Sequence, residues 1–140
     1  MYAEAVNEVE GHLDDLGLEC LNQVRRRAYG FPPMIANTEI DFSTTDFASP
    51  QDVRDYIMLE RARELCFEGF RRFDLIRWNK LAEVLATFAD KFNAAVNDGT
   101  LKNYVWAAGN YFQAGKHELY PIPEYEIRET KGTLKQNPRY

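Results

Sequence analysis

The sequence predicts an all-α fold of paired helices, with long irregular loops and an extended C-terminal segment. Apolar residues recur with the period of an amphipathic helix in residues 2–9, 16–28 and 49–98. Residues 31–48 and 99–140 break this pattern with prolines, glycines and asparagines. At 140 residues, the chain has the size of one domain and can bury a core without disulfides or metals.

Residues 1–30 are predicted to form a helix hairpin. The first helix shows the i, i+3, i+4, i+7 repeat of an amphipathic helix in Tyr2, Ala5, Val6 and Val9. Gly11 is expected to end it, Asp14 or Asp15 to cap the second helix, and Gly30 to stop that helix. Two helices joined by a short turn within about 30 residues form an antiparallel hairpin of the size of a tetratricopeptide unit.

Residues 49–98 are predicted to hold two long helices after the loop at 31–48. Ser49 is the expected N-cap of the first, with a proline at its first helical position, and this helix is predicted to run to Phe70 or Phe73. Asp74 is predicted to cap the second, which ends at Asn97-Asp98-Gly99.

Residues 99–140 are predicted to be a loop-rich closing segment. Leu119 to Pro123 should be extended, because a residue before proline is pushed out of the α region. A short helical turn is expected from Glu124 to Arg128, followed by a tail without helical period.

The most charged stretch, residues 60–78, is also rich in apolar residues. At helical spacing, one face carries Leu59, Ala62, Cys66, Phe70 and Phe73. The acids and arginines are interpreted as a structural ion network of Glu60, Arg61, Arg63, Glu64, Glu68 and Arg71. Arg63 falls on the apolar face, so it is predicted to be mostly buried and paired with Glu60 or Glu4.

Composition excludes several classes of protein. The net charge of −5 argues against nucleic acid as a partner, and no run of apolar residues reaches the length of a membrane span. Cys20 and Cys66 match no metal spacing and are expected to be core thiols, so no metal and no cofactor is predicted. His12 and His117 are isolated and are expected in surface or loop positions.

Three blocks of the sequence resemble the SusD/RagB family. The central block is Glu60-Arg61-x-Arg63-Glu64-Leu65-x-Phe67-Glu68-Gly69-x-Arg71, followed by Phe73-Asp74-Leu75-x-Arg77-Trp78. Before it stand Tyr2-Ala3-Glu4-Ala5 and Asn22-Gln23-Val24-Arg25. After it stand Leu119-Tyr120-Pro121-Ile122-Pro123, Glu126-Ile127 and Gln136-Asn137-Pro138-x-Tyr140. The order of the blocks makes the resemblance specific.

The resemblance implies tetratricopeptide-like helix pairs and a role in nutrient uptake. Family members are outward-facing outer-membrane lipoproteins of Bacteroidetes, which bind glycans and act as a lid on a SusC-like TonB-dependent transporter. They are several times longer than this chain. The resemblance therefore implies that residues 1–140 are the C-terminal part, with the lipidated N-terminal part absent from this chain. It carries over no sugar-contacting residue.

A glycan site needs exposed aromatic rings with polar side chains around them. Residues 103–113 have that mixture, and the predicted, weak glycan contacts are Tyr104, Trp106, Asn110 and Tyr111. The loop 31–47 ranks second, with Phe31, Asn37 and Asp41.

Two other function classes remain open from the residues alone. A tetratricopeptide-like scaffold for protein interaction would want more than the two helix pairs seen here. A glycoside hydrolase needs two carboxylates about 5 to 9.5 Å apart across a cleft. Residues 101–116 contain no acid, so the protein is predicted not to be an enzyme.

Overall fold

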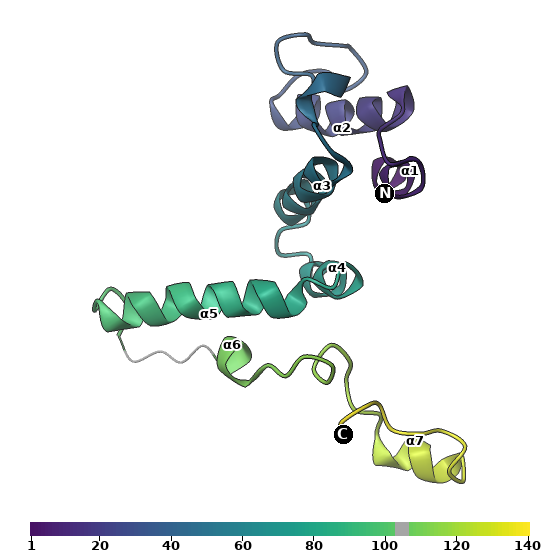
Figure 1. Ribbon diagram of the computed structural model, residues 1–140, viewed down its shortest axis with the longest axis vertical. Helices are drawn as coiled ribbons and strands as arrows, with labels where there is room; N and C mark the ends of the chain where they lie inside the picture. The colour runs from purple at the N-terminus through teal and green to yellow at the C-terminus, as the bar shows by residue number, and fades with distance from the viewer. Residues whose placement is uncertain (103–106) are drawn as a thin grey trace. The chain divides into compact units, whose positions relative to one another are not determined.

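The computed structural model describes residues 1–102 and 107–140 and divides into two compact units, Met1–Glu68 and Gly69–Tyr140 (Figure 1). All regular structure in these described residues is helical, as predicted. The helices are α1 (Tyr2–Glu10), α2 (Asp15–Ala28), α3 (Pro50–Glu64), α4 (Arg71–Arg77), α5 (Leu81–Asn97), α6 (Ala107–Tyr111) and α7 (Glu124–Glu129), with a 3-10 turn η1 (Thr44–Asp46). None of the described helices is long and apolar enough to cross a membrane.

The ends of the first three helices follow the predicted capping signals. Gly11 ends α1 in the left-handed region, at φ 72°. The Asp14 carboxylate caps α2 by accepting the Gly17 N–H at 2.6 Å. The Ser49 hydroxyl caps α3 by accepting the Asp52 N–H at 3.3 Å.

The first unit packs around one small apolar cluster. Its buried members come from α1, α2 and α3 and are Ala3, Leu21, Val53 and Ile57. Helix α1 contacts both other helices, and α2 runs across the page in Figure 1 whereas α1 and α3 are seen nearly end-on. Helices α1 and α2 therefore cross each other, instead of running antiparallel as the short connection had predicted.

The loop 31–48 forms as predicted, and buried side chains of α2 hold it. Asn22 is 4% exposed; it donates to the Phe42 carbonyl at 3.0 Å and accepts the Phe42 N–H at 2.8 Å. The Phe42 ring lies 4.9 Å from the Tyr56 ring of α3, edge to face. The loop is thus anchored by two hydrogen bonds between the Asn22 amide and the Phe42 backbone, and by the contact between the Phe42 and Tyr56 rings.

Arg26 makes the second anchor of this loop and is 1% exposed. Its guanidinium donates to Asp41 Oδ1 at 2.7 Å, to Glu19 Oε1 at 2.8 Å and to the Pro33 carbonyl at 2.7 Å. The sequence analysis predicted no ion network at this position, so the buried network around Arg26 is a finding of the structure.

The long helix predicted to reach Phe70 or Phe73 ends at Glu64 instead. The chain then turns through Phe67 at φ 65° and Gly69 at φ 80°, a region that glycine enters without steric cost. Periodicity does not separate one continuous helix from two short ones, which is why the break was missed. The predicted apolar face is interrupted as a result, and its members Cys66, Phe70 and Phe73 are exposed rather than in the core.

The prediction that Asp74 caps the next helix is also wrong. Asp74 lies inside α4, is 5% exposed and accepts from Arg77 Nε at 3.0 Å. The break falls at Asn79, which adopts φ 55° while the Lys80 N–H donates to the Leu75 carbonyl at 2.8 Å. This is a Schellman-type helix end, in which asparagine is the commonest substitute for glycine.

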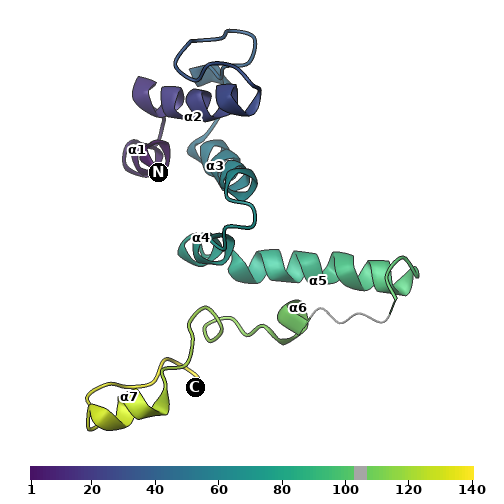
Figure 2. The same cartoon turned by 180° about the vertical axis from the view of Figure 1, so that it is seen from behind.

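In the second unit, α6 packs on α5, and the closing segment follows (Figure 2). The extended stretch before α7 forms as predicted and is held by amide side chains from the tail. Gln136 accepts the Ile122 N–H at 2.8 Å and donates to the Ile122 carbonyl at 2.9 Å. Asn137 donates to the Tyr120 carbonyl at 2.6 Å. In the third resembling block, the side chains of Gln136 and Asn137 thus hold the extended residues 120–122 in place.

Candidate functional site

The predicted glycan-contacting residues are only partly within the described structure. Tyr104 and Trp106 lie outside the described residues. Asn110 and Tyr111 are exposed residues of α6, and the Tyr111 side chain is 67% exposed. An exposed ring at the end of a helix can present one face to a ligand, and the sugar-contacting role of Tyr111 stays a prediction.

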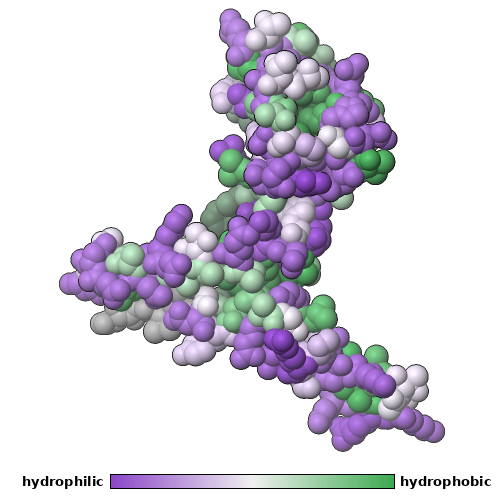
Figure 3. Space-filling view, in the orientation of Figure 1, coloured by the Kyte–Doolittle hydropathy of each residue, from purple (hydrophilic) through white to green (hydrophobic). Residues whose placement is uncertain are grey.

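Tyr111 lies on the rim of a pocket of about 500 Å³ in the second unit. Helices α4, α5 and α6, the segment after α6 and the C-terminal residue all contribute to it. Its aromatic and cationic lining residues are Arg71, Arg72, Tyr111, Phe112, His117, Tyr120 and Tyr140. Figure 3 shows apolar side chains in green interspersed with hydrophilic ones around α4 and the adjoining end of α5.

Arg72 organises one wall of this pocket. Its Nη2 donates to the His117 carbonyl at 2.5 Å, and its guanidinium carbon lies 5.0 Å from the centre of the Tyr120 ring. The Tyr140 hydroxyl donates to the Leu119 carbonyl at 3.1 Å, which fixes the C-terminal ring beside them. The wall therefore combines residues of the central block, 60–78, with residues of the third block, 119–140.

His117 stands between two aromatic rings of the pocket. Its ring centre lies 5.9 Å from that of Phe112 and 6.4 Å from that of Tyr140. Its Nδ1 accepts the Gln113 N–H at 2.9 Å, so the neutral ring carries its proton on Nε2. His117 lies in a turn, as predicted, and it also lines the pocket.

Sequence reasoning missed most of this pocket. Arg72 was not singled out as a site residue, and Tyr120 and Tyr140 were recognised only as parts of a resembling block. The sequence held one signal for the pocket, because the third resembling block contains two aromatic residues, Tyr120 and Tyr140. Nothing in the sequence showed that this block would meet α4.

The loop 31–48, the second predicted sugar site, uses its polar residues for its own structure. Asp41 accepts from Arg26 and from the Asn37 N–H, the latter at 2.9 Å. The Asn37 side chain in turn accepts the Glu39 N–H at 3.1 Å. These groups are engaged within the protein, which weakens the case for this loop as a sugar site.

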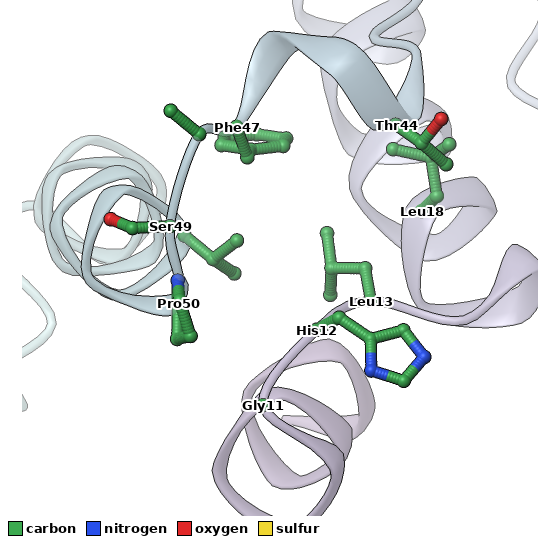
Figure 4. Close-up of a pocket in the computed structure, with 10 residues that line it drawn as sticks. Gly11, His12, Leu13, Leu18, Thr44, Phe47, Ser49 and Pro50 are labelled. Carbon is green, nitrogen blue, oxygen red and sulfur yellow. The ribbon is translucent and has the colours of Figure 1, made fainter.

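A smaller cavity of about 230 Å³ opens in the first unit between the α1–α2 turn and the start of α3 (Figure 4). The Leu13 side chain points into it, with the Phe47 ring across from it, whereas the Ser49 hydroxyl turns away toward its own helix. Because its lining is mostly apolar and its polar groups point elsewhere, it lacks the convergent polar groups of a ligand site.

Charged residues of the central block, residues 60–78, form ion pairs within α3 and with α2. Glu60 lies 3.7 Å from Arg63, and Glu64 pairs with Arg27 of α2. The Arg63 side chain is 62% exposed, so the prediction that it is mostly buried is wrong, although its pairing with Glu60 is confirmed. The reason is that the helix ends one residue later, and the predicted apolar face does not continue beyond it. Among the described residues, no group of three acids, histidines or cysteines could hold a metal.

Comparison with known proteins identifies the family. A family model described as the SusD family matches residues 1–140. The chain belongs to the SusD family. Two SusD-like proteins of Formosa agariphila, P25 and P38, are 35% and 34% identical to it over 92 and 83 residues. These matches cover 66% and 59% of the chain, and 16% of each relative.

A solved structure supports the fold class as well. The crystal structure of a SusD homolog from Bacteroides thetaiotaomicron matches 99% of the chain with a TM-score of 0.70 and 32% identity. The match covers 25% of that chain. The all-α, tetratricopeptide-like fold class predicted from the sequence is thereby confirmed, and the SusD-family chain spans about a quarter of its solved relative.

Proposed function

We propose that this chain is the C-terminal part of an outward-facing SusD-like lipoprotein of the outer membrane. In this proposal the whole protein binds oligosaccharides and passes them to a SusC-like TonB-dependent transporter. Family membership over residues 1–140 supports the proposal, because SusD-like proteins are nutrient-binding proteins rather than enzymes.

The observation that carries a binding role for this part of the protein is the aromatic pocket of the second unit. Its volume of about 500 Å³ falls within the range of small-molecule sites, which is about 300 to 1,000 Å³. A sugar ring has apolar C–H faces between its hydroxyl groups, and Tyr111 presents an exposed ring at the rim. The pocket is thus proposed to form one edge of a glycan site.

The competing function classes receive less support from the same residues. Hydrolysis of a glycosidic bond needs two carboxyl groups facing a cleft, and the described residues that line this pocket include no Asp or Glu. A scaffold of stacked helix pairs would bury a continuous core. In the described residues, the buried cluster is confined to α1, α2 and α3.

Titration calorimetry of the chain against a panel of oligosaccharides tests the proposal. We expect weak binding, with Kd in the millimolar range and a binding free energy of about −4 kcal/mol. Tyr111→Ala should weaken it, whereas Tyr125→Ala, which removes an exposed ring of α7, should not.

Trp106→Ala is the companion variant, because the sequence predicts a second stacking ring there. Micromolar affinity that survives both Tyr111→Ala and Trp106→Ala would place the glycan site elsewhere in the protein.

A further inference from the structure

Arg72 brings a positive charge to the aromatic pocket of the second unit, and the described residues that line this pocket include no Asp or Glu. We propose that it selects an anionic sugar, one bearing a carboxylate or a sulfate ester, with the anionic group bound by Arg72 and Arg71. This inference rests on the proposed glycan binding and narrows the class of glycan.

The charge at Arg72 is not neutralised by the described protein. Among the described residues its partners are the carbonyl of His117 and the ring of Tyr120, and neither carries a negative charge. Its Nε is buried and has no hydrogen-bond partner among the described residues. A half-buried cation with an unsatisfied donor is costly, and an anion in hydrogen-bond contact with the guanidinium offsets that cost.

Glu118, the acid next to His117, does not supply this counter-charge. Glu118 follows His117 but is not among the residues that line the pocket. The backbone N–H of Gly115 is the first cause that lowers the pKa of its carboxyl group, while its Oε2 is buried without a hydrogen-bond partner among the described residues. Its negative charge is therefore stabilised by the backbone and stays outside the pocket.

The cations and the aromatic rings are placed for different parts of one ligand. Arg71 and Arg72 are consecutive on α4 and both line the pocket, and an arginine fork matches the geometry of a carboxylate or a sulfate. Tyr111 lines the same pocket from α6 with an exposed ring. A sugar stacked on Tyr111 would direct an acidic substituent toward the guanidinium groups.

The test compares charged probes with their neutral partners in binding titrations at low salt. Trigalacturonate is paired with its methyl ester, and N-acetylglucosamine 6-sulfate with N-acetylglucosamine, so that the two sources of negative charge are distinguished. We expect at least one charged probe to bind about tenfold more tightly than its partner, a preference that falls as salt shortens the Debye length. Arg72→Gln should abolish the preference, whereas Arg128→Gln, which removes an exposed charge on α7, should leave it intact.

The outcomes separate the two proposals. Equal binding of charged and neutral probes overturns the anionic preference and leaves glycan binding standing. A preference that persists in both Arg72→Gln and Arg71→Gln places the anion elsewhere and also overturns it. If no probe binds the unaltered chain at millimolar concentration, the proposed function fails, and this inference fails with it.

Circular dichroism checks that each variant is folded. If Arg72→Gln does not fold, Arg71→Gln and Arg72→Lys carry the test. Lysine keeps the charge but loses the two-pronged geometry, so Arg72→Lys should retain a reduced preference. An undiminished preference in Arg72→Lys and in Arg71→Gln together would count against the site.

Discussion

Two segments without helical period, the loop 31–48 and the stretch 119–122, are held in place by different chemistry. Arg26 binds the loop through a buried ion pair with Asp41 and a bond to the Pro33 carbonyl, and it also pairs with Glu19 of its own helix. Gln136 binds the second segment through a neutral amide that pairs with the Ile122 backbone. A buried charge that loses its partner is far costlier than a lost neutral hydrogen bond, so the two anchors should differ greatly in what their removal does.

Arg26→Ala should give the largest effect of any substitution considered. It leaves Asp41, whose side chain is 13% exposed, without its cation, and it removes the bond to the Pro33 carbonyl. We expect the midpoint of thermal unfolding to fall by roughly 10 °C or more. Differential scanning fluorimetry at neutral pH measures the shift.

The matched control is the next residue along the helix. The Arg27 side chain is 61% exposed and pairs with Glu64 at the surface, where ion pairs contribute little. Arg27→Ala should move the midpoint only slightly. Equal losses in the two variants would mean that the burial of Arg26 is not what makes it important.

Acid should weaken the loop anchor before it affects the amide anchor. The Arg26 hydrogen bonds, the first cause for each group, lower the pKa of the carboxyl groups of Glu19 and Asp41. A lowered pKa means that the folded state binds fewer protons than the unfolded state near pH 4, so stability falls as the pH falls. The contribution is complete above about pH 5 and is lost as the pH drops through the lowered values.

Urea unfolding between pH 7 and pH 3 measures this slope in the unaltered chain and in Arg26→Met. The methionine variant should show a shallower loss of stability, because the pKa of each carboxyl group is no longer lowered by a cation. Parallel curves for the two proteins would show that other acids dominate the pH response.

Gln136→Glu tests the neutral anchor with a smaller expected effect. Glutamate can still accept the Ile122 N–H but cannot donate to the Ile122 carbonyl, and its charge faces that oxygen. Loss of one such hydrogen bond costs about 1 kcal/mol, so hydrogen exchange around Ile122 should accelerate about five- to tenfold. Gln113→Glu, an exposed change of the same chemistry, is the control.

Local rules predicted much of the fold, and their failures have physical causes. Gly11, Asp14 and Ser49 were recognised because capping depends on a few adjacent residues. The breaks at Gly69 and Asn79 were missed because the apolar residues on either side of each break keep the spacing of one continuous helix.

The candidate site was less predictable than the helices. Tyr111 was recognised from local composition, because an aromatic residue among polar ones suggests a stacking surface. Arg72 and His117 come together from positions 45 residues apart, a separation that no local pattern encodes. Which side chains share a pocket depends on tertiary packing, and the sequence alone contained no signal for it.

Arg63→Ala should have a smaller effect on stability than Arg26→Ala or Gln136→Glu. Its side chain is 62% exposed, and its Nη1 lies 3.7 Å from Glu60 Oε2, which is beyond hydrogen-bond distance. An exposed pair at i, i+3 is worth less than about 1 kcal/mol, because water and salt screen the attraction. Urea denaturation of Arg63→Ala, with Arg63→Lys as the variant that keeps the charge, measures the difference. A loss comparable to that of Arg26→Ala would mean that charge itself, and not its burial, sets the strength of these anchors.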